Sequence, residues 1–150
     1  MMNDVNNPQK FKYDPSRIDM SGNLGIDTDG GPKRNDLNWK PNTSATKDSN
    51  GNYIPRGDHD PSLNPDKDPY VVAPGNSGIK VGDLATITEP DGTQRTYQVG
   101  DIGPEGKAGE VASATAKDMG DNVSDTPDGP VVNGQGTPVT VTFYRGTHKY

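Results

Sequence analysis

Short runs of β-branched and aromatic residues recur along the chain, and they predict β-strands. One run covers residues 70–73. Residues 84–88, 95–99 and 139–143 contain alternating apolar and polar positions, the pattern of half-buried strands. Residues 89–92 (Glu-Pro-Asp-Gly) have the composition of a type I turn, so the second and third runs should form a hairpin. We therefore expect a mostly β fold.

Helical periodicity is confined to one short stretch. Ala112, Ala116 and Met119 are spaced i, i+4 and i+7, which places them on one face of a helix. Gly120 follows, and glycine is the usual residue just beyond a helix end. The sequence thus predicts one or two short helices beside the strands.

Long irregular segments are expected in the rest of the chain. Residues 33–69 and 121–130 are polar and rich in turn-forming residues, so both are interpreted as loops. Residues 1–20 are interpreted as an extended N-terminal arm or linker, which leaves residues 21–150 as a single domain. The chain is 27% hydrophobic and contains 19 glycines and 14 prolines, a composition that predicts a small core.

Charge and cysteine content exclude several classes of function. The chain has no cysteine, so it has neither disulfides nor thiolate chemistry. A net charge of −6 argues against a nucleic-acid partner and favours a cationic or neutral ligand. No apolar run is long enough to span a membrane, and the N-terminus lacks the apolar segment of a secretory signal peptide. We expect a monomer that is secreted or delivered outside its cell without a classical signal.

Two acidic residues flank the loop between the third strand and the helix. Asp101 is predicted at the end of the strand, because residues 102–104 (Ile-Gly-Pro) should not continue a ladder, and Glu110 comes just before the helix. Two carboxylates held near each other are the minimum requirement for acid/base hydrolysis. The structural alternative is an aspartate that forms a turn and a glutamate that favours a helix N-terminus.

Further side chains with binding chemistry lie in the predicted loops. Trp39 either stacks on a sugar or anchors its loop to the core. Asp27 and Asp29 could supply the base or bind the amines of a sugar. Residues 27–29 begin like a calcium loop, but the rest of that pattern is absent. The predicted substrate-binding residues are thus Asp27, Asp29, Trp39 and Tyr70. We expect neither a metal nor a cofactor.

The order of short motifs resembles that of the glycoside hydrolase family 75 chitosanases. The motifs are residues 26–30 (IDTDG), 69–74 (PYVVAP), 82–85 (GDLA), 99–104 (VGDIGP) and 109–110 (GE). That family cleaves the β-1,4 links of chitosan with inversion, using an aspartate and a glutamate. The resemblance implies that Asp101 and Glu110 are this pair. As a hypothesis, Asp101, beside the apolar Ile102 and the rigid Pro104, is the general acid and Glu110 activates water, although the sequence does not decide which of the two is the acid. The chain is shorter than members of the family, and Val111 follows Glu110 where they have glycine or alanine.

The same core also resembles the double-psi β-barrel of rare lipoprotein A and of some lytic transglycosylases. This second resemblance implies a six-stranded barrel with the acidic residues at a groove on its rim. Those proteins act on the glycan strands of peptidoglycan.

Three functions follow as expectations. The first is an endo-acting, inverting hydrolase of a chitosan-like amino-sugar polysaccharide. The second is a peptidoglycan-cleaving muramidase or lytic transglycosylase, which as a secreted antibacterial effector would have an immunity protein as partner. The third is a non-catalytic carbohydrate-binding module on the same scaffold.

Overall fold

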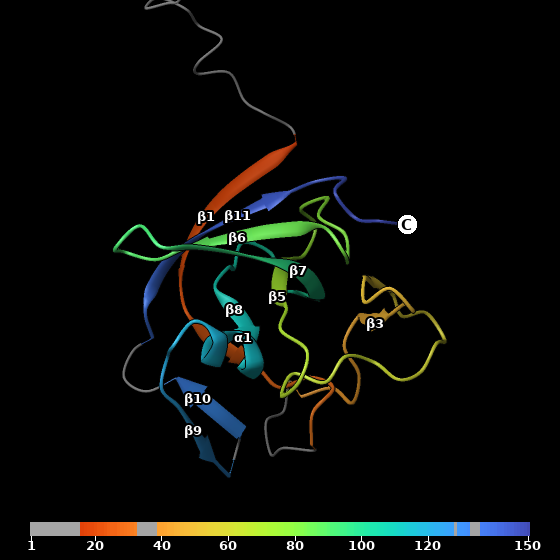
Figure 1. Ribbon diagram of the computed structural model, residues 1–150, viewed down its shortest axis with the longest axis horizontal. Helices are drawn as coiled ribbons and strands as arrows, with labels where there is room; N and C mark the ends of the chain where they lie inside the picture. Colours follow the sequence, from red (N-terminus) through yellow and green to blue (C-terminus); the bar gives the residue numbers. More distant parts are fainter. Residues whose placement is uncertain (1–15, 33–38, 128, 133–135) are drawn as a thin grey trace, which may run out of the picture.

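The computed structural model describes residues 16–32, 39–127, 129–132 and 136–150, and most of its regular structure is β (Figure 1). Its strands are β1 (Arg17–Asn23), β2 (Gly25–Asp27), β3 (Ala45–Lys47), β4 (Tyr53–Pro55), β5 (Val71–Pro74), β6 (Leu84–Thr88), β7 (Gln94–Gly103), β8 (Glu110–Ala112), β9 (Val123–Thr126), β10 (Gly129–Val132) and β11 (Pro138–Tyr144). The helix of the described residues, α1 (Ser113–Asp118), follows β8 directly. The mostly β class with a short helix is confirmed.

A seven-stranded mixed sheet forms the body of the domain, in the order β1-β11-β6-β7-β5-β8-β2. Antiparallel pairing joins β1 to β11, β11 to β6 and β6 to β7. In contrast, β5 runs parallel to β7, and β2 runs parallel to β8. Two hairpins, β3–β4 and β9–β10, stand apart from this sheet (Figure 1).

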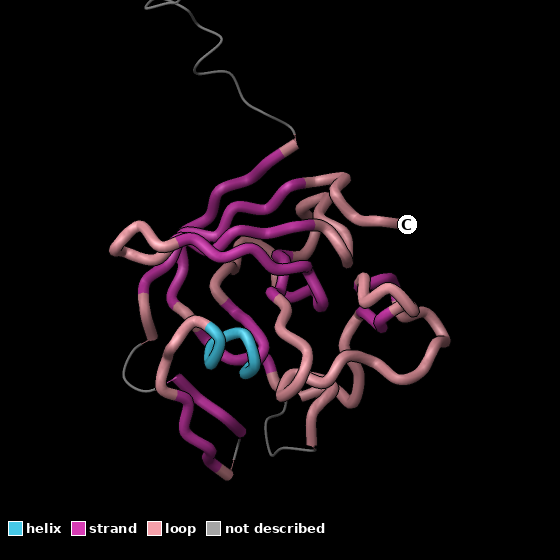
Figure 2. The backbone as a smooth tube through the Cα atoms, in the orientation of Figure 1, coloured by secondary structure: helices cyan, strands magenta, loops and turns pink. Residues whose placement is uncertain are grey.

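The sheet is curled into a half-barrel. Its two edge strands, β1 and β2, are consecutive in the chain and are separated only by Leu24. A flat seven-stranded sheet would hold its edges about 29 Å apart, whereas one intervening residue spans less than about 8 Å. The curl visible in Figure 2 brings the edges together. Backbone hydrogen bonds from Leu24 to Thr137 (2.8 Å) and from Gly25 to Gly109 (3.0 Å) hold the crossing.

The core lies inside the curl, and the alternating strands supply it. Val139, Val141 and Phe143 of β11 are buried, as are Ala85 and Ile87 of β6. Both strands had been predicted from their period of two, and β6 has the bounds expected. The turn between β6 and β7 also forms as predicted, with Gly92 donating to the carbonyl of Glu89.

Helix α1 forms where the apolar spacing predicted it. Ala116 and Met119 are buried, and Gly120 has the left-handed φ of +86° that a glycine after a helix end adopts without strain. Two hydroxyl groups attach the helix to the segment that precedes β5. Ser113 donates to the carbonyl of Pro65, and Thr115 donates to the carbonyl of Tyr70. The helix is therefore a fixed support beneath β8 and β2.

Strand β7 is longer than the sequence predicts, and Asp101 lies within it rather than at its end. The second half of β7 pairs with β5, matching Val72 with Asp101 and Pro74 with Gly103. The parallel partner continues the ladder past Ile102, and Pro104, which lacks an amide hydrogen, follows its end. The position of Asp101 is thus set by the pairing of this half of β7 with β5.

Several strands were missed in segments expected to be irregular, among them β8, which forms where a loop was expected to lead into the helix. Strand β1 begins at Arg17, inside the predicted arm, and pairs with β11 along its whole length. The hairpin β3–β4 forms within residues 33–69, and β9 forms within residues 121–130. These strands are short or largely polar, so their pairing partners stabilise them more than their own composition does. Residues 1–15, 33–38 and 128 of these predicted segments lie outside the described residues.

Asp83 joins the C-terminal segment to the sheet, and its replacement is expected to destabilise the fold. Its fully buried carboxylate accepts hydrogen bonds from the backbone amides of Lys80, Thr147 and His148 and contacts the His148 ring at 2.7 Å. Asp83→Asn replaces one accepting oxygen with an NH2 group, which cannot accept a hydrogen bond from these donors. We therefore expect a loss of about 2 kcal/mol in the free energy of unfolding. Urea unfolding measures it, with the exposed Asp58→Asn as control. Equal stabilities of the two variants would contradict the assignment.

Candidate active site

Four acidic residues named from the sequence line one cavity of about 700 Å³. Asp27, Asp29, Asp101 and Glu110 form part of its wall, together with Trp39. These residues come from segments that are far apart in the sequence. The volume lies within the about 300–1,000 Å³ of small-molecule sites.

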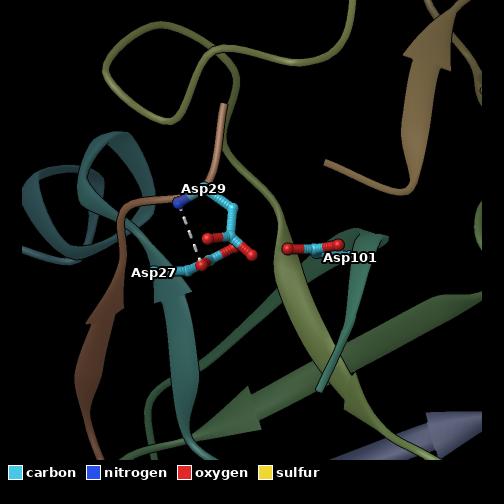
Figure 3. Close-up of side chains that lie close together, drawn as sticks. All are labelled: Asp27, Asp29 and Asp101. Carbon is cyan, nitrogen blue, oxygen red and sulfur yellow. Dashed lines mark hydrogen bonds between the residues drawn. The ribbon is translucent and has the colours of Figure 1, made fainter. Parts of the chain in front are cut away.

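The curl of the sheet brings the aspartates together. Asp101 belongs to β7 and Asp27 to β2, with β5 and β8 between them in the sheet. A flat sheet would place these two strands about 14 Å apart. Instead, one carboxylate oxygen from each of Asp27, Asp29 and Asp101 lies within 4.8 Å of the others. Figure 3 shows the three carboxyl groups directed toward one another.

Hydrogen bonds orient each member of this aspartate cluster. Asp101 accepts through Oδ1 from the backbone amide of Ser44 (2.9 Å) and from its hydroxyl (2.8 Å). Asp27 accepts through Oδ1 from the backbone amide of Asp29 (3.2 Å), the dashed line of Figure 3. Asp29 accepts from the backbone amide of Lys40 (2.8 Å). The cluster is therefore preorganised by the backbone around it.

Crowding of buried carboxyl groups makes the cluster hold a proton. Burial, and then the charge of Asp101, raise the pKa of Asp27 to about 9. Burial also raises the pKa of Asp29 to about 6, against the hydrogen bond from Lys40 that favours its charged form. A carboxylic acid, Asp27, is thus present in the cavity at neutral pH.

Tyr70 does not contact the cavity, which corrects its predicted role in substrate binding. Its side chain is fully buried, and its hydroxyl donates to Oδ2 of Asp27 at 2.9 Å. Burial and the neighbouring Asp27 raise the pKa of Tyr70, so the phenol remains a donor. Tyr70 therefore positions Asp27 from behind instead of touching a ligand.

A β-bulge before Asp101 directs its side chain, and the sequence analysis missed it. The β5–β7 register shifts between Val71, which pairs with Val99, and Val72, which pairs with Asp101, so Gly100 is the extra residue. A Cβ on Gly100 would lie 2.6 Å from the Cβ of Tyr70. Only glycine allows this approach, so the Val-Gly-Asp order was an available signal.

Ser44, Lys40 and Lys107 are also part of the site or contact it, and no sequence pattern identified them. Ser44 lies in the stretch expected to be irregular, just before β3, and Lys40 and Lys107 line the cavity. Trp39 is partly exposed on the cavity wall, and its indole N–H has no acceptor among the described residues. Trp39 lines the cavity, and the choice between sugar stacking and anchoring of its loop stays a prediction.

The aspartate cluster could also offer three oxygen ligands to a divalent cation. A cation there requires all three carboxyl groups to be deprotonated, because a metal competes with protons for its ligands. The raised pKa of Asp27 opposes that state. A proton and a divalent cation would therefore compete for the aspartate cluster.

The cavity combines a proton donor, proton acceptors and an aromatic ring. Such a set of groups can bind a polar ligand and transfer protons to and from it. No protein-family model and no curated protein matches the sequence. The chemistry of the cavity is thus the basis on which a function can be assigned.

The stability of the fold is expected to fall as the pH rises from 5 to 8. The unfolded chain releases the Asp27 proton near its ordinary pKa of 3.8, whereas the folded chain keeps it until about 9. The folded state therefore binds more protons across this range, and each pH unit removes up to about 1.4 kcal/mol. Urea unfolding at each pH measures the slope, which Asp27→Asn should flatten. An unchanged slope in that variant would rule out Asp27 as the source.

Proposed function

We propose that the protein is a glycoside hydrolase that cleaves β-1,4 links of a chitosan-like amino-sugar polysaccharide by carboxyl acid/base catalysis. The observation that carries this proposal is the aspartate cluster, which retains a proton at neutral pH inside a cavity that Glu110 also lines. The resemblance of residues 99–110 to the chitosanase motif supports it independently.

The aspartates of the cluster are too close to one another to form the inverting pair. One carboxyl oxygen of each lies within 4.8 Å of the others, whereas an inverting enzyme needs about 6.5–9.5 Å to place a water between its acid and its base. Glu110, at the start of β8, lines the same cavity as Asp101, and its Oε1 lies 3.9 Å from the position that a Cβ on Gly103 of β7 would take. Glu110 is the carboxylate outside the cluster that we propose as the partner of Asp101.

Each residue then has a defined role. Asp101 protonates the glycosidic oxygen with a proton that Asp27 supplies, since one carboxyl oxygen of each lies within 4.8 Å of the other, and Asp27 regains its proton from solvent. Glu110 removes a proton from the water that attacks the anomeric carbon as the bond to the leaving sugar breaks. Asp29 accepts the substrate's ammonium group, and Trp39 stacks on a sugar face.

A double-psi β-barrel is the topology that we propose for this sheet. Two features support it. The edge strands are joined through Leu24, which almost closes the curl, and two parallel pairs, β5–β7 and β2–β8, are each formed by strands that are separated in sequence.

Peptidoglycan is the second candidate substrate, and the lysines favour it. Lys40 and Lys107 line the cavity beside the acidic residues, and an ammonium group there would pair with a carboxylate of the peptide attached to a muramic acid unit. In this reading the protein is a muramidase or lytic transglycosylase delivered outside its cell, and an immunity protein is its expected partner.

Product analysis tests the proposal. The protein is incubated separately with chitosan and with purified peptidoglycan, and the masses of the products are determined by mass spectrometry. Glucosamine oligomers whose new reducing ends first appear as the α-anomer in proton NMR would support inversion. Muropeptides would move the assignment to the cell wall, with anhydro ends marking a transglycosylase. If neither glycan is cleaved, the catalytic assignment fails and a binding module remains.

A further inference from the structure

A second cavity of about 530 Å³ adjoins the candidate active site. Two residues connect the cavities. Ile102, which follows Asp101 in β7, lines both of them, and Ser44 lines the second cavity while its hydroxyl and amide hold Asp101. A ligand that passes over the end of β7 therefore meets the acid and the second cavity in succession.

Exposed apolar side chains gather in the wall of the second cavity. Three large hydrophobic side chains are exposed among the described residues, namely Ile102 (36%), Val131 (44%) and Tyr150 (53%). Two of the three, Ile102 and Tyr150, line this cavity, together with Pro55, Pro74 and Ile79. Exposed apolar side chains that gather in a hollow are typical of a binding surface.

The Tyr150 ring is held in place although it is half exposed. Its hydroxyl donates to the carbonyl of Val81 at 2.9 Å, and its ring stacks on His148 with 4.3 Å between centroids. The His148 ring is in turn 2.7 Å from the buried carboxylate of Asp83. A fixed ring loses little conformational entropy when a ligand binds, so this arrangement favours stacking.

We propose that this second cavity is a further sugar subsite, which binds the next unit of the same glycan beyond the bond that Asp101 attacks. The inference rests on the proposed function, since it extends the path of that substrate. Tyr150 and Ile102 pack against the CH face of a sugar ring, and Asn76 and Lys80 of the cavity wall offer hydrogen bonds to its hydroxyl groups. We name this the Tyr150 subsite.

The dependence of cleavage on substrate length tests the subsite. Glucosamine oligomers from the dimer to the hexamer are given to the wild type, to Tyr150→Ala and to Tyr150→Phe. For oligomers long enough to span both cavities, Tyr150→Ala should raise KM about tenfold while kcat and the KM of the shortest cleaved oligomer stay unchanged. Tyr150→Phe keeps the ring and should behave as the wild type does.

Several outcomes would overturn the subsite. One is an equal loss of activity by Tyr150→Ala at every length, which would indicate a structural role, and another is no loss at any length. The folded state of each variant is checked by its Tm.

A binding measurement separates this inference from the proposed function. Glucosamine hexamer is titrated into the Asp101→Asn variant, and amide NMR shifts are followed. Shifts at both Ile102 and Tyr150 would support the subsite even if the wild type cleaves nothing. Shifts confined to the cavity of the aspartate cluster would overturn the subsite and leave the proposed function intact.

Discussion

Replacing Asp101 with asparagine should lower kcat for glycan cleavage by about 10³-fold, because the variant has no acid to protonate the leaving oxygen. The fold should survive, since the asparagine side-chain oxygen can still accept the two hydrogen bonds from Ser44. The release of reducing ends measures the rate. Asp58→Asn, which alters an exposed carboxylate, is the matched control and should retain full activity.

Glu110 distinguishes the two candidate reactions. An inverting hydrolase needs a base as well as an acid, so Glu110→Gln should approach the loss seen in Asp101→Asn. A lytic transglycosylase needs a single acid/base group, and the Glu110 variant would then lose far less. An Asp101→Asn variant with wild-type activity on a substrate that the wild type cleaves would refute the catalytic role of Asp101.

Replacing Gly100 with alanine should reduce the free energy of unfolding by about 3 kcal/mol. The added methyl group would lie 2.6 Å from the Cβ and Cγ of Tyr70 and 2.7 Å from Cδ1 of Leu63. Both neighbours are fully buried, so neither can move without displacing the core. Because Tyr70 also holds Asp27, activity should fall together with stability.

A second glycine provides the control for this effect. Gly25 lies in β2, and a Cβ there would meet no atom within 4 Å. Gly25→Ala should therefore change the free energy of unfolding by less than about 0.5 kcal/mol. Urea unfolding compares the two variants. A Gly100→Ala protein as stable as Gly25→Ala would show that the bulge tolerates a side chain.

Local patterns in the sequence were sufficient to predict the class of the fold. The alternation in residues 84–88 and 139–143 identified β6 and β11, and the spacing from Ala112 to Met119 identified α1. These patterns record which face of an element is apolar, which is a property of neighbouring residues in the chain. Strand β1 was missed although Ile18 and Met20 alternate with polar residues, because two apolar positions in a polar segment are a short signal and its ladder with β11 contributes most of its order.

The acidic residues of the site were identified from the sequence one by one, as Asp27, Asp29, Asp101 and Glu110. One shared site was also expected for them, but the close contact of the three aspartates was not, because it depends on contacts between distant segments. The 4.8 Å approach of the aspartates results from the curl between β2 and β7, and the Ser44 contact comes from a segment with no pattern of its own.

The kinds of functional group available to the site were therefore determined by the sequence alone. The presence of carboxyl groups, the lack of cysteine and the excess of acidic residues are all fixed by composition. Proton affinity was decided only by the tertiary structure. The pKa of Asp27 depends on burial and on the carboxylate of Asp101, which is far away along the chain. Likewise, Tyr70 supports Asp27 instead of binding a ligand because the bulge at Gly100 lets its ring enter the core. Burial and charge proximity are properties of packed space, and a linear pattern does not contain them.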